Sequence, residues 1–496
     1  MQSKSQHPQA STLGELRASG HVHRSVKEEI RENLLTRMRV GQDRFPGIVG
    51  FDQTVLPHLE RALLAGHDVI LLGERGQGKT RLIRTLASLL DDWSPAVAGC
   101  EINDHPFQPV CSRCQRLAAE LGDDLPVTWR QPADRYGEKL ATPDTSVGDL
   151  IGDIDPVKVA EGRTLGDPET IHFGLVPRTN RGIFCLNELP DLAERIQVAL
   201  LNVLEERDIG VRGYALRLPL DIVLVASANP EDYTNRGRII TPLKDRFGAE
   251  VRTHYPVSLT SELALISQEA EVSWGGKDPG AVLPAHITEI IARFTRLVRE
   301  SPAVDSRSGV SARFAIAAAE SAAAAAVRRS ALAAEPRDEL PVARICDLPP
   351  IVSTLRGKVE FEVSEEGRED EVLSHLLRRA TAETFRARLG GADLSGLLDK
   401  FADGTTIISG ELVPAAELLR RTGEVPGLAK IMERLGMEGG ESFGEAAAAI
   451  EFALEGLYLL RRLSKDSSDG LSVYGQQLDP VLAQGADPLE PPMRAR

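Results

Sequence analysis

Short apolar runs alternate with amphipathic segments through the first half of the chain. Three runs, DVILL at 68–72, GIFCL at 182–186 and DIVLVAS at 221–227, are apolar almost throughout. This is typical of central strands in a parallel sheet that is buried on both faces. Helical patterns separate the runs, which predicts an α/β domain with a parallel sheet covered by helices. We expect this domain to span 41–256.

Helical periodicity dominates the second half. Apolar residues recur at helical spacing in ITEIIARFTRLVRE, and the segment SARFAIAAAESAAAAAVRRSALAAE is rich in alanine, the best helix former. We expect a helical lid over 257–348. The pair Pro349–Pro350 predicts a boundary, after which 349–463 should form a mainly helical C-terminal domain.

The two ends of the chain are polar. Residues 1–40 are expected to form a mobile arm with one short helix, and 464–496, rich in Ser, Asp, Gly, Pro and Gln, a disordered tail. The first residues lack the apolar core of a signal peptide, and no segment approaches the roughly 20 apolar residues that span a bilayer. We therefore expect a cytoplasmic protein without a membrane partner.

Length and charge narrow the class of protein. A chain of 496 residues has room for several domains. Its net charge of −15 disfavours a protein that coats phosphate backbones, so nucleic acid is not an expected partner. Five cysteines are too few for a disulfide framework.

A glycine-rich motif follows the first apolar run. LLGERGQGKT places Gly73, Gly78, Lys79 and Thr80 in the spacing G-x-x-x-x-G-K-[ST], after a predicted strand and before a predicted helix. In such a loop, backbone N–H groups wrap the β-phosphate, the lysine reaches the β/γ oxygens and the hydroxyl coordinates Mg²⁺. The motif therefore predicts ATP and Mg²⁺ as cofactors. The remaining residues of the predicted nucleotide loop are Glu74, Arg75, Gly76 and Gln77.

The second and third runs end in polar residues. Asn187 and Glu188 stand where a magnesium site commonly carries two acids. Asn187 can accept a hydrogen bond from a magnesium-bound water but adds no negative charge, whereas Glu188 keeps the carboxylate of a general base. A working ATPase slowed by the amide, and an ATP-binding scaffold or regulator with little turnover, both remain open. Asn229 is either placed to contact the γ-phosphate or a turn residue before Pro230.

Together these motifs resemble the AAA+ ATPases, in the branch of the magnesium chelatase ATPase subunit and the MoxR-type proteins, over about 45–335. FPGIVGFD resembles the box beside the adenine, which implies nucleotide contacts for Ile48 and Val49. The nucleotide loop is similar to the family's Walker A motif, and the strand that ends at Glu188 to a variant Walker B motif. VASANPED resembles the sensor 1 strand, which implies that Asn229 senses the γ-phosphate.

Two arginines gain a role from the resemblance. TPLKDRFG resembles the segment with the arginine finger for a neighbouring subunit, which implies that role for Arg246. GVSARFAIAAAE resembles the lid helix with sensor 2, which implies it for Arg313. A guanidinium can hold two γ-phosphate oxygens, and one supplied across an interface couples hydrolysis to assembly. From the residues alone, a surface ion pair for Arg246 and a solvated helix face for Arg313 are the alternatives.

The resemblance also implies partners. Relatives form rings of identical subunits, often hexamers, and remodel a client protein, which in some relatives carries a metal-binding adhesion-type domain. ERDIGVRGYALRLPLDIVL resembles a hairpin that faces the ring pore, so Val211, Arg212 and Tyr214 are candidates for partner contact. The GAFTGA loop of alternative sigma factor activators and a helix-turn-helix are missing from the sequence, which counts against transcription activation. A nucleic-acid motor and a magnesium-inserting subunit are further alternatives.

Cysteines gather in one segment, GCEINDHPFQPVCSRC. Cys100, His105, Cys111 and Cys114 supply four soft or borderline ligands, which suit tetrahedral Zn²⁺. Their spacing is not a common zinc-finger pattern, and a set of reduced cysteines with His105 in a turn is the alternative. A zinc ion here would be structural, because four protein ligands leave no open position for catalysis.

Overall fold

The computed structural model places most of the chain in two compact units, Met1–His254 and Tyr255–Arg496, which are described separately. The residues that the structure describes are 7–160, 170–205, 208–211, 214–230, 239–273, 280–305, 309–336, 339–437, 442–468, 470–477 and 489.

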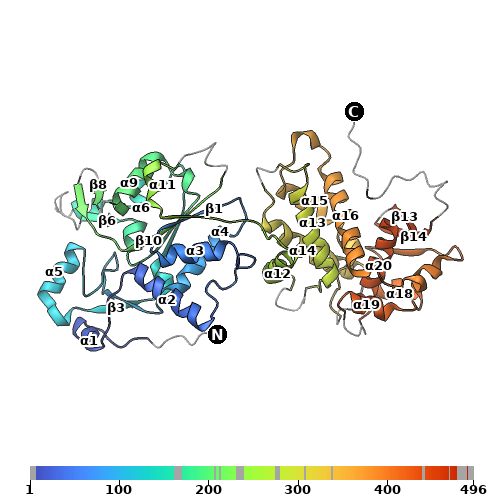
Figure 1. The fold of residues 1–496 in the computed structure, drawn as a ribbon, viewed down its shortest axis with the longest axis horizontal. Helices are drawn as coiled ribbons and strands as arrows, with labels where there is room; N and C mark the ends of the chain where they lie inside the picture. Colours follow the sequence, from blue (N-terminus) through green and yellow to red (C-terminus); the bar gives the residue numbers. More distant parts are fainter. Residues whose placement is uncertain are drawn as a thin grey trace. The chain divides into compact units, whose positions relative to one another are not determined.

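Among the described residues of the first unit, five parallel strands form one sheet in the order β11-β1-β10-β7-β4. Figure 1 labels the neighbouring central strands β1 and β10 of this sheet. The central strands β1, β10 and β7 are the three apolar runs of the sequence, and each is buried along its whole length. The predicted α/β sheet is therefore confirmed. The strand bounds are β1 (Val69–Leu72), β4 (Tyr136–Leu140), β7 (Gly182–Asn187), β10 (Ile222–Ala228) and β11 (Ala249–Arg252).

Each face of this sheet has its own apolar core. On β1, Ile70 belongs to one core and Leu71 to the other, because successive side chains of a strand point to opposite faces. Helices α2, α3 and α4 pack in the core of Leu71, and α6, α8, α9 and α11 in that of Ile70. The helices of the unit are α1 (Leu13–Ala18), α2 (Val26–Val40), α3 (Val55–Leu64), α4 (Lys79–Thr85), η1 (Leu86–Leu89), α5 (Ser112–Leu121), η2 (Gly122–Asp124), η3 (Pro132–Arg135), α6 (Val147–Leu150), α7 (Pro156–Ala160), α8 (Leu175–Arg178), η5 (Leu189–Asp191), α9 (Glu194–Glu205) and α11 (Thr241–Arg246).

Small antiparallel pairs lie outside the main sheet. They are β2 (Ser94–Val97) with β3 (Val127–Arg130), β5 (Gly152–Ile154) with β6 (Ile171–Phe173), and β8 (Asp208–Val211) with β9 (Tyr214–Arg217). The last pair is the hairpin expected before the third central strand. Val211 and Tyr214 are paired in its register, whereas Arg212 lies outside the described residues.

The second unit is mainly helical, around one apolar core. Its helices are α12 (Leu259–Glu269), α13 (Ala285–Glu300), α14 (Ala312–Leu332), η6 (Ile345–Asp347), α15 (Ile351–Leu355), η7 (Arg356–Lys358), η8 (Val363–Glu365), α16 (Glu369–Leu389), α17 (Ser395–Leu398), η9 (Asp399–Phe401), α18 (Ala415–Thr422), α19 (Leu428–Arg434) and α20 (Phe443–Leu459). Its antiparallel strands have the order β12 (Ile407–Gly410), β14 (Leu471–Gln476), β13 (Leu463–Ser468). No described helix of the chain is both long and apolar enough to cross a membrane.

The N-terminal segment differs from the expected mobile arm. Helix α2 buries Val26, Ile30 and Leu34 in the core beside α3. Its first turn is closed by a capping box in which Glu28 N–H donates to Ser25 Oγ at 3.3 Å and Ser25 N–H donates to Glu28 Oε2 at 2.8 Å. Buried apolar residues on a capped helix hold this part of 1–40 on the domain.

Part of the expected disordered tail is folded, at 464–468 and 470–477, whereas most of 478–496 lies outside the described residues. The expected boundary after 348 also differs from the structure. Strands β13 and β14 form a hairpin in which Tyr474 is 2% exposed and donates to Glu455 Oε2 at 2.6 Å. Polar residues between the apolar side chains of this hairpin conceal its strand pattern in the sequence. Pro349 and Pro350 lie inside the second unit, just before α15, because one core joins the helices on both sides of them.

Candidate nucleotide site

The glycine-rich loop joins β1 to α4 at the carboxyl end of the central strand. Gly76 and Gly78 have φ angles of 72° and 75°, in the left-handed region that favours glycine. A Cβ on Gly73 would lie 2.0 Å from Thr253 Oγ1 and 2.3 Å from Gln77 Oε1. Because the Thr253 hydroxyl donates to Gln77 Oε1 at 2.7 Å, only glycine fits at the start of the loop.

Lys79 begins α4, and its side chain is buried against the loop, with 6% of the residue exposed. Its Nζ donates to Gly73 O at 2.5 Å, to Glu74 O at 2.8 Å and to Asn229 Oδ1 at 2.7 Å. Charged acceptors form stronger hydrogen bonds with an ammonium group than carbonyl oxygens do. A phosphate oxygen would therefore compete well for this lysine.

Asn229 connects the loop to the candidate base. Its Nδ2 donates to Glu188 Oε2 at 2.7 Å, while its Oδ1 accepts from Lys79. Glu188 has φ 54° and ψ 49°, a left-handed conformation that is costly for a residue with a Cβ. Its N–H donates to Ser227 Oγ at 3.3 Å. The structure thus brings together three predicted residues from β1–α4, β7 and β10.

Asn187, at the end of β7, has its amide fixed on both sides. Its Oδ1 accepts from Thr80 Oγ1 at 3.4 Å and from Ser227 Oγ at 3.1 Å. Its Nδ2 donates to Glu138 Oε1 at 2.8 Å. This network, which decides which end of an amide is oxygen, puts the oxygen of Asn187 on the side of Thr80.

Glu138, on the neighbouring strand β4, is a functional candidate that the sequence did not reveal. Its carboxylate accepts from Asn187, from Tyr136 Oη at 3.0 Å and from Arg84 Nε at 2.8 Å. The Arg84 guanidinium holds the pKa of Glu138 below its ordinary value. An acidic residue in the short strand YGEKL was visible, but its position opposite Cys185 depends on the pairing of β4 with β7.

Arg246, the predicted arginine finger, lies near the other end of β1. Its Nη1 is 3.1 Å from Asp68 Oδ2, and Asp68 also pairs with Lys27 Nζ at 3.0 Å. Asp68 directly precedes β1, whereas the nucleotide loop follows it. The four residues of β1 place these two ends about 13 Å apart at roughly 3.3 Å per residue. The action of Arg246 on a neighbouring subunit stays a prediction.

The remaining predicted contacts have looser surroundings. Ile48 and Val49 are half-buried before α3, and Ile48 packs on the core of that face. Arg75 is exposed. Arg313 belongs to the second unit, where its N–H donates to Ser311 Oγ at 3.1 Å at the start of α14. Roles of these residues toward a nucleotide stay predictions.

The cysteine segment forms a compact cluster, but with one change of ligand. The structure brings the three predicted cysteines together with Asp104, not with His105. Phe107 N–H donates to His105 Nδ1 at 3.0 Å, and His105 Nε2 lies 3.3 Å from His21 Nε2. The chain turns at Asn103, which has φ 54°. The cysteine–aspartate cluster, whose ligand atoms all lie within 4.8 Å of one another, consists of Cys100, Asp104, Cys111 and Cys114.

The members of this cluster shift one another's titration. Hydrogen bonds from Cys111 and Cys114 lower the pKa of the Cys100 thiol, and the same contacts with Cys100 raise the pKa values of its two partners. Burial raises the pKa of Asp104 to about 6. The three thiols and the carboxyl group are thus close enough to affect one another's ionisation.

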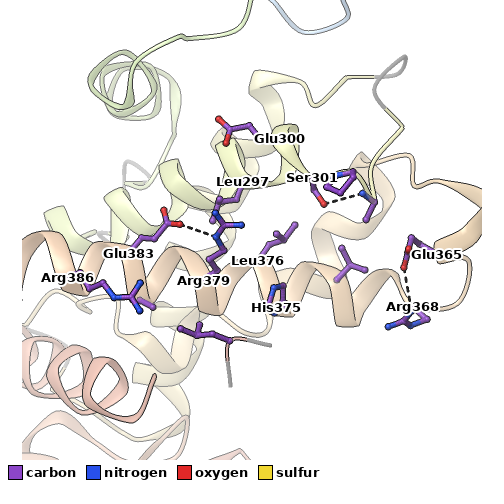
Figure 2. Close-up of a pocket in the computed structure, with 15 residues that line it drawn as sticks. Leu297, Glu300, Ser301, Glu365, Arg368, His375, Leu376, Arg379, Glu383 and Arg386 are labelled. Carbon is purple, nitrogen blue, oxygen red and sulfur yellow. Dashed lines mark hydrogen bonds and ion pairs between the residues drawn. The ribbon is translucent and has the colours of Figure 1, made fainter. Parts of the chain in front are cut away.

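A groove in the second unit has a different character (Figure 2). It has a volume of about 770 Å³ and lies along α13 and α16. Charged groups of both signs line it and pair with one another: Arg379 Nε donates to Glu383 Oε1 at 3.0 Å, and Arg368 Nη1 lies 3.6 Å from Glu365 Oε2. Because these charges are mutually satisfied, the groove does not favour a ligand of one sign.

Comparison with known proteins finds sequence similarity over part of the chain, and the match to a family model lies within the first unit. Residues 164–246, which include β7 and β10, match the model of the Sigma-54 interaction domain. Magnesium-chelatase subunit ChlI of Nostoc sp. is 29% identical over 233 residues, which cover 46% of this chain and 58% of that protein. The magnesium-chelatase 38 kDa subunit of Acidiphilium rubrum is 31% identical over 207 residues, covering 40% and 54%.

A solved structure of the complex between the magnesium chelatase subunits BchI and BchD has 28% identity and a TM-score of 0.33, with 45% of this chain and 65% of that chain covered. The chain spans a little over half the length of the curated relatives quoted above. The chain carries a glycine-rich loop between β1 of a parallel sheet and helix α4, and over part of its length it is similar in sequence to subunits of magnesium chelatase.

Proposed function

We propose that this chain is a cytoplasmic, Mg²⁺-dependent ATPase that assembles into a ring of its own copies and remodels a partner protein. The observation that carries the proposal is the hydrogen-bonded series Lys79–Asn229–Glu188. It joins a phosphate-binding lysine to a carboxylate at the edge of a parallel sheet where nucleotides bind.

The residues present fit ATP with Mg²⁺. Backbone N–H groups of the glycine-rich loop and Lys79 would hold the phosphates, and the close approach at Gly73 leaves room for backbone only. Thr80 Oγ1 and Asn187 Oδ1, 3.4 Å apart, offer the oxygen atoms that a hard cation and its waters prefer. When bound, Mg²⁺ neutralises charge that develops on the phosphate oxygens.

Glu188 is the residue proposed to accept the proton of the attacking water. Its Oε2 accepts from Asn229, whose Oδ1 accepts from Lys79. If Lys79 turns from Asn229 to a phosphate oxygen, the asparagine loses a cationic partner and its hold on Glu188 weakens. The series thus gives a route by which phosphate binding frees the base.

Glu138 explains how an asparagine can serve in place of the expected acid. The amide of Asn187 donates to Glu138 and so keeps its oxygen toward Thr80. We infer that Glu138 is a positioning residue, since it fixes the orientation of Asn187 and returns a negative charge to this edge of the sheet. Binding without turnover, the scaffold alternative, loses its main support if this pair is productive.

The place of Arg246 supports assembly. It is held at Asp68, before β1, while the loop follows β1. An arginine at that end would meet a nucleotide bound to another copy more easily than its own, which is how an arginine finger couples hydrolysis to assembly. A hexamer is the proposed ring, and Arg313 the proposed sensor on the lid.

A protein client completes the proposal. The Nostoc and Acidiphilium relatives are named as subunits of magnesium chelatase, so each works with other subunits. We propose a protein partner, with a metal-binding adhesion-type domain as the leading type. The hairpin β8–β9 is the proposed contact surface.

Steady-state ATP hydrolysis with Mg²⁺, measured across protein concentration, tests this function. Glu188→Gln should keep binding of a fluorescent ATP analogue but lose turnover by about 100-fold or more, as expected for loss of a general base. Glu194→Gln, an exposed acid at the start of α9, is the matched control and should retain turnover. Turnover per chain should rise with concentration if sites form between subunits.

The alternative outcome is equally clear. If wild type binds the analogue but hydrolyses ATP no faster than Glu188→Gln at any concentration, the chain is an ATP-dependent scaffold. If turnover is high but independent of concentration, the trans role of Arg246 is wrong.

A further inference from the structure

A buried carboxylate oxygen of the cysteine–aspartate cluster lacks a hydrogen-bond partner among the described residues. Asp104 is 0% exposed. Its Oδ2 accepts from Val110 N–H at 3.1 Å and from Cys111 N–H at 2.9 Å, while its Oδ1 has no partner. Burying a polar atom without a partner is costly. This oxygen therefore lies where a cation would be stabilised.

The sulfur atoms around Asp104 have the support that metal thiolates receive. Asp104 N–H donates to Cys100 Sγ at 3.3 Å, and Cys114 N–H donates to Cys111 Sγ at 3.4 Å. Hydrogen bonds from the backbone hold ligand atoms in place and stabilise their negative charge. Two of the three sulfurs are thus oriented before any ion binds.

We propose that the cysteine–aspartate cluster is a structural Zn²⁺ site with three sulfur ligands and Asp104 Oδ1 as the fourth ligand. With Zn–S bonds of about 2.3 Å, ligand atoms in a tetrahedral site lie roughly 3.8 Å apart, so separations of up to 4.8 Å need little closure. Thiolates select zinc over Mg²⁺ or Ca²⁺. Four protein ligands close the site to substrate.

The proposed site would add a metal link to the hydrogen bonds that hold this segment on the domain. Asn103 Nδ2 donates to Arg178 O at 2.8 Å, and Asn180 Nδ2 donates to Ile102 O at 3.1 Å. Arg178 and Asn180 lie just before β7, the strand that ends at Asn187. Zinc would thus stabilise the segment 100–114, which contacts the residues just before β7. The proposal does not depend on ATP hydrolysis.

Metal analysis of the full-length protein, purified without added zinc or chelator, tests the site. About one zinc per chain is expected. Replacement of zinc by Co²⁺ then reports which ligands bind the metal. Cobalt should give thiolate charge-transfer bands and the intense visible bands of tetrahedral geometry. Cys111→Ser and Cys114→Ser should lower zinc affinity by more than about 100-fold, beyond the loss seen when only a supporting group is removed.

The choice between Asp104 and His105 gives the sharpest control. Asp104→Ala should lower zinc affinity and change the cobalt spectrum, whereas His105→Gln should leave both unchanged. Binding of a fluorescent ATP analogue reports whether each variant is folded, so loss of metal is separable from loss of structure. Zinc lost in His105→Gln but kept in Asp104→Ala would overturn the ligand set. A protein with no bound zinc and no thiolate–cobalt bands after reconstitution would overturn the site.

Discussion

The candidate nucleotide site of the first unit, at the carboxyl ends of β1, β7 and β10, and the interior of the second unit both bury charged groups. The partners of these groups differ between the two places. Lys79 reaches two backbone carbonyls and the amide oxygen of Asn229. Arg329, in α14, is 1% exposed and binds Asp347, Glu335 and the carbonyl oxygen of Val342. The first arrangement can exchange its acceptors for a phosphate, whereas the second matches a cation to two carboxylates. Substitutions should therefore affect function at the first and stability at the second.

The largest effect is expected for Arg329→Met. The change leaves Asp347 and Glu335 without their guanidinium in a buried site, where Asp347 is 2% exposed. Breaking such a pair costs about 3–5 kcal/mol. The free energy of unfolding of the second unit, from urea titration followed by hydrogen exchange in α14 and η6, should fall by this amount. Binding of a fluorescent ATP analogue by the first unit should persist.

Arg328→Met is the matched control, one residue away. Arg328 is 63% exposed and pairs with Glu411 at the surface, and exposed pairs contribute little. Its unfolding should stay close to that of wild type. Equal loss of stability in both variants would show that α14 is sensitive to any change of charge, and the contrast between buried and exposed pairs would fail.

Asn229→Ala should have the next largest effect, on turnover. It removes the group that holds both Lys79 and Glu188, so ATP hydrolysis should fall by about 100-fold, as for loss of a group that positions a general base. Asn180→Ala removes an equally buried asparagine that bonds to backbone at Ile102 and Asp221. It should lower stability but leave kcat of the folded protein within a few-fold of wild type. The reverse result would place Asn180, not Asn229, in the site.

Motif spacing predicted the part of the site that lies on contiguous segments. The glycine-rich loop needs glycine at Gly73 because Thr253 and Gln77 approach closely there. The spacing of the motif placed a glycine at this position without knowledge of the contact with Thr253. The central strands were readable because each is apolar on both faces. Local chemistry and burial thus gave the sheet and the positions of Lys79 and Glu188.

Tertiary pairing decided what the sequence could not predict. Glu138 reaches Asn187 only because β4 lies beside β7, and no spacing rule links residues so far apart in the chain. Asp104 replaces His105 because Asn103 adopts a left-handed turn and His105 packs beside His21. The hairpin β13–β14 was not predicted because polar residues dominate its first strand, LSKDSS, in which Leu463 is the one apolar residue.

His286 is a buried polar residue of the second unit that, unlike Arg329, has no hydrogen-bond partner among the described residues. It is 0% exposed beside Phe452, and neither ring nitrogen has a hydrogen-bond partner among the described residues. Burial, aided by the charge of Arg388, lowers the pKa of His286 to about 3. The unfolded chain binds this proton near pH 6.5, so stability should fall as pH drops from about 6.5 toward 3, by up to about 1.4 kcal/mol per pH unit.

His286→Leu should remove this dependence. At pH 7 the variant should be as stable as wild type or up to about 1 kcal/mol more stable, since an unpaired polar group leaves the core. The difference in unfolding free energy should widen as pH falls from 6.5 to 4.5. His58→Gln, an exposed histidine on α3, is the control and should show no such widening. Parallel curves for His286→Leu and wild type would mean that folding does not change the pKa of His286.

Asn187→Asp should give the smallest effect. Whether turnover rises or falls decides whether the Asn187 amide and the Glu138 carboxylate act as a pair. The new carboxylate would stand where Asn187 Nδ2 now donates to Glu138 Oε1 at 2.8 Å. Two like charges at that distance disfavour the ionised pair, so turnover should fall by about 3- to 10-fold, although the change restores the commoner acid. Glu138→Gln in the same chain returns one amide and one carboxylate, and the double variant should regain wild-type turnover. Steady-state kcat for the four proteins of this cycle measures the coupling. If Asn187→Asp hydrolyses ATP faster than wild type, both alone and together with Glu138→Gln, the amide of Asn187 slows turnover and Glu138 does not position it.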